Sequence, residues 1–196
     1  MPRVKIDYIV SFSSEDSENP ASNLLSWEVS KKRWLCAKGE PSCSVVLQLT
    51  KAVKISAIHI GAHNAAFVEV LVGRSEKPNE PFQVLLPSSV FLSPSESRRA
   101  EGVERVRSFS EPLLTGAGGA QRWDRVRLVC SQPYNKHCKY GLSFVQIYEP
   151  ESLELAMAPS PGGSSEDEFK PGELFAAHRN NSQQSNSDTG CHHSPH

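Results

Sequence analysis

The residues of this chain whose types could do chemistry gather in one stretch, RVRLVCSQPYNKHCKYGLSFVQIYEP, residues 125–150. Cys130 and Cys138 lie eight residues apart, and His137 directly precedes the second cysteine. A thiol activated by a histidine is a nucleophile, and suitably spaced cysteines and histidines bind zinc. The stretch therefore raises three hypotheses: a reactive site, a metal site, or the closing hairpin of a β domain with a basic face.

The spacing of these residues favours the third hypothesis. Cys130 and Cys138 do not form a CxxC pair, and no second pair offers the spacing of a tetrahedral zinc site. Cys130 is in phase with Val126 and Leu128, which indicates a small buried hydrophobic residue. His137 and Cys138 fall in a loop rich in turn residues, where adjacent side chains rarely meet productively. We therefore expect no catalytic residue, no metal and no cofactor.

The elements that must position these residues are short strands. Apolar and polar residues alternate in runs bounded by Gly, Pro, Ser or Asn: VKIDYIVSF, SVVLQL, VKISAIHIG, FVEVLVG, FQVLLP, RVRLVC and GLSFVQIY. The first run places on one face Val4, Ile6, Tyr8, Val10 and Phe12. The third ends at Gly61, and FQVLLP stops at its proline. Such runs predict an all-β sandwich or barrel, with short helical turns only in NPASNLLSWEVSKKRW.

The chain changes character after Pro150. Residues 151–196 are rich in Ser, Pro, Gly, Asn and Gln and cannot bury enough apolar surface to offset the entropy of ordering, so we expect a disordered tail. Charge divides in the same way. Residues 1–150 hold 19 Lys and Arg against 15 Asp and Glu, whereas the tail holds 2 against 7. A basic domain, 1–150, followed by an acidic tail, 151–196, suggests an anionic partner for the domain.

One aromatic residue is out of phase with its apolar neighbours. In AFVEVLVG, Val68 and the valines two and four residues later point one way, so Phe67, Glu69 and Leu71 point the other way. If the valines face the core, an aromatic ring lies on the outer face, where it would serve as an interface anchor. The alternative is that a second layer or a loop covers this outer face.

Several longer stretches carry a resemblance to a known family. SAIHIGAHNAAFVEVLVGRS, VFLSPSESR, RWDRVRLVCSQPYNK and GLSFVQIYEP resemble the N-terminal domain of the X-ray repair cross-complementing scaffold of single-strand-break repair, and VSFSSEDSENPASNLL and SVVLQL match it in the same order. The resemblance covers about residues 1–150 and not the tail, as in a small paralogue containing only that domain. It implies an antiparallel β-sandwich of the galactose-binding-like jelly-roll type and no enzymatic activity. It also implies a nuclear location, and binding to the catalytic region of DNA polymerase β and to gapped or nicked DNA.

The same resemblance implies which residues contact the polymerase. The family's anchoring phenylalanine falls on Phe67, its companion valine on Val84 and its arginine on Arg107. We add Glu69, which shares the face of Phe67. The residue after Arg107 is Ser108, where the family has a larger apolar residue, and this departure predicts a weaker contact.

A second departure concerns redox chemistry. Members of the family can pair two cysteines near the N-terminus, and those positions hold Phe12 and Pro20 here. That disulfide therefore cannot form. The five cysteines of this chain are expected to be free thiols, because no apolar signal-peptide region is present and the protein is expected inside the cell. No apolar run of 18 residues occurs, so we expect no membrane span. We also expect a monomer.

Charge density alone selects the candidates for DNA contacts. Residues 98–139 hold 9 basic and 4 acidic residues. Lys and Arg side chains bind phosphates and release condensed counterions. The candidates from this region are Arg105, Arg107, Arg125, Arg127, Lys136 and Lys139.

The tail contains a phosphorylation pattern. In GGSSEDEF, Ser164 and Ser165 each lie three residues before an acidic residue, which is the pattern that acidophilic kinases of the casein type read. A phosphorylated tail would be a ligand for a forkhead-associated domain or a competitor of DNA for the basic face, and the alternative is a solubilising tail.

Two other function classes stay open at this point. One is a carbohydrate- or lipid-binding sandwich module of the discoidin-like type, which the missing signal peptide and the unpaired cysteines disfavour. The other is an enzyme that uses Cys138 and His137, which the loop position of these residues disfavours.

Overall fold

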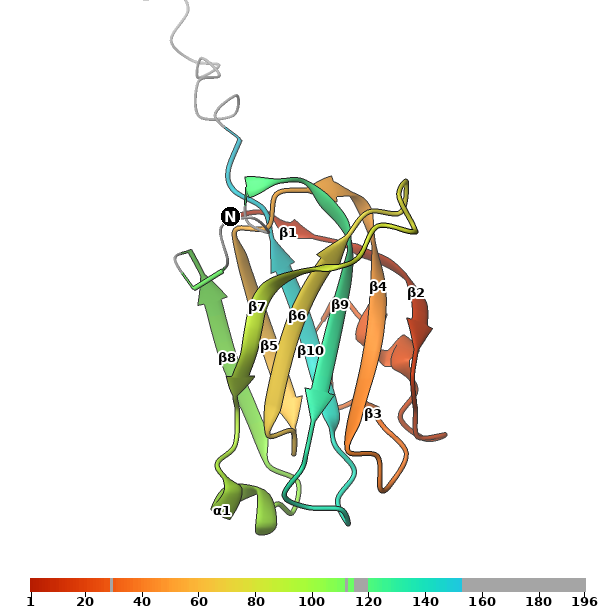
Figure 1. Cartoon of the computed structure of the whole chain (residues 1–196), viewed down its shortest axis with the longest axis vertical. Helices are drawn as coiled ribbons and strands as arrows, with labels where there is room; N and C mark the ends of the chain where they lie inside the picture. The colour runs from red at the N-terminus through yellow and green to blue at the C-terminus, as the bar shows by residue number, and fades with distance from the viewer. Residues whose placement is uncertain (29, 112, 115–119, 153–196) are drawn as a thin grey trace, which may run out of the picture. The chain divides into compact units, whose positions relative to one another are not determined.

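The computed structural model describes residues 1–28, 30–111, 113–114 and 120–152. All of its elements lie within the unit Met1–Glu151. Two five-stranded antiparallel sheets pack face to face, as Figure 1 shows. One sheet, called sheet B here, has the strand order β2 (Ile6–Phe12), β4 (Ser42–Val53), β9 (Trp123–Ser131), β6 (Phe67–Gly73) and β7 (Gln83–Val90).

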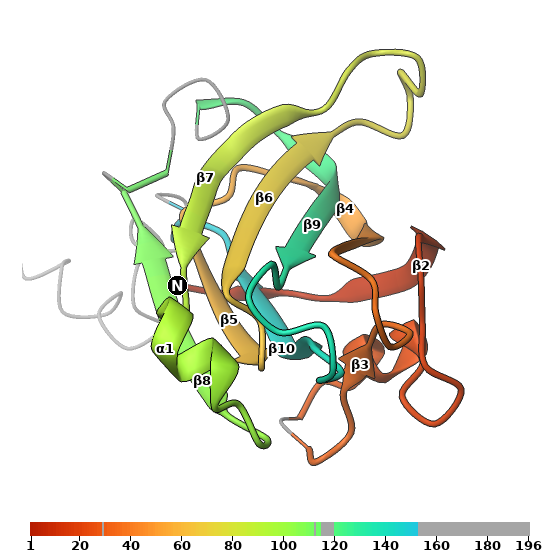
Figure 2. The same ribbon diagram turned by 60° about the horizontal axis from the view of Figure 1, so that its bottom comes forward.

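The second sheet, sheet A, has the order β1 (Arg3–Val4), β10 (Gly141–Tyr148), β5 (Ala57–His63) and β8 (Glu104–Ser110), and β3 (Trp34–Leu35) also pairs with β10. A 3-10 helix, η1 (Ala21–Leu25), and one short α-helix, α1 (Pro94–Arg98), complete the described elements. Figure 2 shows the two layers from the end at which α1 lies. The predicted β-sandwich is therefore confirmed.

The core lies between the sheets and is built from alternate residues of each strand. Sheet B contributes the buried valines of β6 together with the apolar positions of β9, and sheet A contributes the apolar positions of β5 and β10. Cys130 is 0% exposed within this core, as its phase predicted. The stretch that contains it does form two strands joined by a loop, but β9 and β10 belong to different sheets and do not pair as a hairpin.

The prediction for the first run, VKIDYIVSF, was wrong beyond Ile6. The pairing of β2 with β4 shifts register between Ile6 and Tyr8 and again between Ile9 and Ser11. Each β-bulge changes which face the following side chains occupy. As a result Ile9 packs against the core, whereas Tyr8 and Phe12 are 48% and 45% exposed.

Other strand boundaries also differed from the predictions. The strand expected to end at Gly61 continues to His63, and β7 runs through Pro87 instead of stopping there. A proline is tolerated in β7 because this strand is at the edge of sheet B, where an unpaired position needs no N–H donor.

Three elements, β3, β8 and α1, were not predicted from the alternation of apolar and polar residues. The helix carried a readable signal, because Ser93 and Glu96 form a capping box in which each side chain accepts the other's backbone N–H. Strand β8 was harder to find, because it lies at the edge of sheet A and is largely exposed, without a clear apolar alternation.

Candidate functional site

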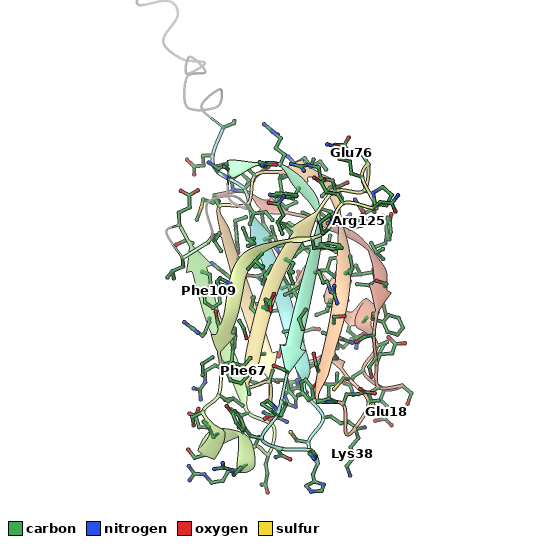
Figure 3. All side chains as sticks on the ribbon, viewed as in Figure 1. Glu18, Lys38, Phe67, Glu76, Phe109 and Arg125 are labelled. Atoms are coloured by element: carbon green, nitrogen blue, oxygen red, sulfur yellow. The ribbon has the colours of Figure 1, made fainter. Side chains whose placement is uncertain are left out.

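The outer face of sheet B carries the out-of-phase aromatic residue. Val68, Val70 and Val72 are each 0% exposed, so Phe67 and the two residues that share its phase project away from the core. All three outward side chains of β6 are half-buried. The orientation predicted from the alternation is therefore confirmed, and Figure 3 shows Phe67 near one end of β6.

Neighbouring strands extend this feature into a patch. On the side of β7, Val90 lies opposite Phe67, and Val84 lies opposite Leu71. Both valines are unusually open to solvent, at 55% and 40% exposure. On the side of β9, Val129 lies opposite Glu69, and Arg127 lies opposite Leu71. We call this patch the Phe67 surface, and it consists of Phe67, Glu69, Leu71, Val84, Val90, Arg127 and Val129.

A hydrogen-bonded loop supports one end of the Phe67 surface. The ring of Tyr134 lies with its centroid 6.0 Å from that of Phe67. The backbone N–H of Tyr134 donates to Oε1 of Gln132 at 3.1 Å, and the Nε2 of this buried glutamine donates to the Asn64 carbonyl at 2.7 Å. The Phe67 ring therefore lies beside a loop that buried hydrogen bonds hold against the domain.

Arg107 reaches the same surface from the other sheet. Its Nη1 donates to the Val90 carbonyl at 2.7 Å, so a side chain of β8 closes against the edge strand β7 of sheet B. Its guanidinium also lies over the rings of Phe109, at 4.7 Å, and Phe91, at 5.6 Å. Ser108 is paired with His59 and, as the next residue of the strand, points to the opposite face.

Two charged side chains of the Phe67 surface have no partner among the described residues. Among the described residues, neither the Glu69 nor the Arg127 side chain has a hydrogen bond or an ion pair, although both are half-buried. A charge that is partly withdrawn from water without a partner is costly, and an interface can supply that partner. The surface thus combines exposed apolar groups with one unpaired charge of each sign.

The DNA-contact candidates do not form one surface. Arg105 lies in β8, Arg125 and Arg127 lie in β9, and Lys136 and Lys139 lie in the loop between β9 and β10. Arg125 and Arg127 share the outer face of sheet B with Phe67.

Three of these candidates are already engaged within the fold. Arg105 pairs with Glu96 at 3.2 Å, the Nε of Arg125 donates to Gln48 at 3.0 Å, and Lys139 pairs with Asp16 at 2.8 Å. The hydrogen bond from Lys139 holds the pKa of Asp16 below its usual value.

The four cysteines that the structure describes are free thiols, and all of them are buried or half-buried. Cys36, Cys43 and Cys130 are buried next to one another in the core. Hydrogen bonding with Cys43, and then burial, raises the pKa of Cys36, and burial raises the pKa of the half-buried Cys138. A raised pKa disfavours the nucleophilic thiolate. In the part of the chain that the structure describes, no three His, Cys, Asp or Glu side chains are grouped to hold a metal ion.

The positions assigned to the family's cysteine pair lie together at the surface. Phe12 and Pro20 line the same cavity of about 220 Å³, next to Ile9 and Ala21. The phosphorylation candidates Ser164 and Ser165, and Cys191, lie outside the described residues. No described helix is long and apolar enough to span a membrane.

Comparison with known proteins identifies relatives of the whole described domain. The family model of the XRCC1 N-terminal domain matches residues 1–147. Human DNA repair protein XRCC1 is 47% identical over 163 residues, which cover 82% of this chain and 26% of the human protein. The chain therefore spans about a quarter of the length of that relative. Residues 1–150 make up less than 82% of the chain, so the aligned segment must extend past Pro150. The similarity therefore continues into the tail, where none was expected.

Solved structures agree with this assignment. A crystal structure of reduced XRCC1 bound to the catalytic domain of DNA polymerase beta is 46% identical, with a TM-score of 0.73, and covers 76% of this chain and all of that one. A chitosan-binding module from Paenibacillus is 13% identical with a TM-score of 0.52, over 70% of this chain and 92% of that module, a likeness of fold alone. Because the family model spans three quarters of the sequence and the sandwich agrees in three dimensions, the chain belongs to the family of the XRCC1 N-terminal domain.

Proposed function

We propose that this chain is a non-catalytic binding module of DNA repair that binds the catalytic domain of DNA polymerase β through the Phe67 surface. The observation that carries the proposal is the composition of that surface: an outward ring, two open valines, and the half-buried Glu69 and Arg127 without partners among the described residues. A related N-terminal domain has been crystallised with that catalytic domain.

The physics of such an interface assigns different roles to these residues. The Phe67 ring is the anchor, because a central aromatic side chain that becomes fully desolvated contributes most to affinity. Glu69 and Arg127 set the orientation of the partner, which must bring a cation opposite the first and an anion opposite the second. Arg107 holds the edge of the surface in place through the Val90 carbonyl.

The test is a calorimetric titration of the full chain with the catalytic domain of polymerase β. We expect Phe67→Ala to weaken binding by about 2 kcal/mol or more. The matched control is Val106→Ala on the outer face of sheet A, where Val106 is 58% exposed and which should leave affinity unchanged. Thermal melts of both variants report folding. A large loss of stability in Phe67→Ala with intact binding would overturn the proposal.

We propose in addition that the domain binds gapped or nicked DNA in the nucleus. The basic residues Arg105, Arg125, Arg127, Lys136 and Lys139 are the candidates for phosphate contacts, and Arg127 and Lys136 have no partner among the described residues. Since Arg125 and Arg127 share a face with Phe67, their contribution to DNA binding should be lost when the polymerase occupies that face.

The tail proposal concerns regulation. Phosphorylation of Ser164 and Ser165 would add about −1.5 to −2 charge at each site, which would favour recognition by a forkhead-associated domain or competition with DNA. Autoinhibition requires that removal of residues 151–196 tightens binding to gapped DNA and that phosphorylation weakens it. Equal affinity of all three forms would leave the tail without a role in DNA binding.

A further inference from the structure

Four flat side chains lie in succession on the outer face of sheet A. The guanidinium of Arg3 lies 4.1 Å from the ring centroid of Trp27. Arg3 in β1 is the cross-strand partner of Tyr148 in β10, so their side chains share a face. The Tyr148 ring in turn lies 4.7 Å from that of His59 in β5. We call these residues, Trp27, Arg3, Tyr148 and His59, the aromatic row.

The aromatic row is open to solvent at one end. Trp27 is 51% exposed, whereas the other two tryptophans, Trp34 and Trp123, are 0% and 1% exposed. A tryptophan this exposed is unusual, and one of its faces is covered by Arg3 while half of its surface stays in contact with water. Tyr148 and His59 are each half-buried and extend the row across the sheet.

The charges around the aromatic row are mainly positive. Lys31 and Lys32 follow Trp27 in its loop, are exposed, and have no ion-pair partner among the described residues, and Glu28 is the only acid of that loop. Glu149, which follows Tyr148, is paired with Lys51 at 2.9 Å. The one carboxylate within the strands of sheet A is that of Glu104, which lies on the same outer face. It is already bonded to Arg33, to Ser143, and to His63 at 2.6 Å.

We propose that the aromatic row is a stacking platform for single-stranded DNA. Bases stack on exposed aromatic rings and on arginine planes without regard to sequence, while nearby lysines bind the phosphates. Both ingredients occur here, Trp27 with Arg3 for the bases and Lys31 with Lys32 for the backbone. The inference rests on the DNA-binding part of the proposed function, and it assigns the unpaired strand to residues outside the basic region 98–139.

The location of the aromatic row makes it independent of the Phe67 surface. It lies on the outer face of sheet A, whereas the Phe67 surface lies on the outer face of sheet B, with the core between them. A single strand bound at the row would leave the Phe67 surface free for a protein partner. The structural alternative is that Arg3 only fastens the loop after η1 to β1, through its stacking and its hydrogen bond to the Trp27 carbonyl.

The experiment uses the full chain and decathymidylate as the probe. Because Trp34 and Trp123 are buried, quenching of tryptophan emission by the oligonucleotide reports on Trp27. We expect quenching that saturates. By anisotropy of a labelled oligonucleotide, affinity should drop about fivefold or more in Trp27→Ala and in Arg3→Ala, the minimum expected for loss of one stacked base. Lys31→Glu should reduce the salt dependence of binding.

The matched control is Tyr8→Ala, which removes a ring of similar exposure, 48%, from the edge strand of sheet B and should leave affinity unchanged. Unchanged emission at saturating oligonucleotide, or Trp27→Ala binding within twofold of the natural chain, overturns the proposal. So does equal weakening by Tyr8→Ala. Polymerase binding by Trp27→Ala, measured in parallel, reports folding, and a failure of polymerase binding in the natural chain would sink only the polymerase proposal.

Discussion

Within the described part of the chain, Glu69 and Arg127 differ from the other charged residues in being half-buried without a side-chain partner. Arg105, Arg125 and Lys139 were selected from the sequence for the same reason as Arg127, yet each is bonded to a neighbour in the fold. A paired side chain must give up its bond before it can contact a ligand, which reduces its net contribution. The candidates for ligand contacts are therefore ranked by whether the side chain is already bonded within the fold, more than by its charge.

The side chain of Arg107 links the two sheets through its hydrogen bond to the Val90 carbonyl, and a substitution of Arg107 tests this link. Arg107→Ala removes the hydrogen bond to the Val90 carbonyl and the stacking on Phe109. We expect polymerase affinity to fall by about 1 kcal/mol and the free energy of unfolding to fall by a similar amount, measured by calorimetry. Arg107→Lys should recover little of the lost affinity or stability, because a lysine ammonium group lacks the planar guanidinium that both donates to the carbonyl and stacks on the ring. Polymerase affinity equal to that of the natural chain would contradict this role.

Asp124 provides a pH-dependent contribution to stability. Burial alone would raise the pKa of its carboxyl, but hydrogen bonds from the Ser75 side chain and backbone and from Gln48 outweigh burial, and the pKa is lowered from 3.8. A carboxyl whose pKa is lower in the folded state stabilises the fold above its unfolded pKa, and this contribution is lost as the pH falls through the folded value.

Asp124→Asn should therefore destabilise the domain by about 1 to 2 kcal/mol at pH 7. The difference between the variant and the natural chain should shrink as the pH is lowered below 3.8, because the carboxyl of the unfolded natural chain binds a proton there while the folded one is still ionised. Urea unfolding of both proteins at a series of pH values measures this difference in the free energy of unfolding. A difference that is constant from pH 7 to pH 3 would show that the charge of Asp124 is irrelevant to stability.

At the scale of elements, the junction of β3 with β10 shows how tightly the sandwich is closed. Gly141 is paired with Leu35 at the start of β10. A Cβ atom placed on Gly141 would lie 2.0 Å from the Trp34 carbonyl oxygen, a backbone atom that cannot rotate away. The close approach of these two strands brings Trp34 into the core, where it is fully buried.

Gly141→Ala is the substitution that tests this junction. We expect a loss of about 2 to 3 kcal/mol or more in the free energy of unfolding, because the two strands must separate to admit the methyl group. Gly39→Ala is the contrasting control, because nothing lies within 4 Å of a Cβ added there. Its φ of +90° strains the backbone of any residue with a side chain, so we expect the free energy of unfolding to fall by about 1 kcal/mol. Equal stability of Gly141→Ala and the natural chain in chemical denaturation would show that β3 is not held against β10.

At the scale of the whole molecule, the sandwich separates two surfaces of different chemistry. The Phe67 surface on sheet B is apolar with one charge of each sign, and the aromatic row on sheet A is flanked by lysines. Proteins that carry two ligands on opposite faces of one rigid domain can bind both at once without competition. The arrangement thus supports a module that joins a polymerase to DNA.

A ternary binding experiment tests this arrangement. The polymerase catalytic domain, bound at saturation, should leave the affinity of the chain for decathymidylate unchanged in sedimentation or anisotropy. Binding of gapped DNA to the free chain should fall about 10- to 100-fold between 50 and 200 mM salt if two to four phosphates are contacted. Competition between polymerase and oligonucleotide would mean that both ligands use the outer face of sheet B.

The sequence by itself determined the features that depend on local alternation. Period-2 runs identified most strands and the sandwich class, and the phase of Val68 and Val70 placed Phe67 on the outer face. The phase of Cys130 likewise placed it in the core. These predictions succeed because a strand has only two faces, and burial of one face decides what the other carries.

Only the tertiary structure decided which residues meet across the molecule. The two bulges of β2 arise from its pairing with β4, so no local pattern reveals that Tyr8 leaves the core. Arg107 meets Val90 because the edges of two sheets lie together, and Arg3 meets Trp27 because a loop folds back onto β1. Such contacts join positions many residues apart through sheet packing, and the charge or polarity of each residue alone carries no information about its partner.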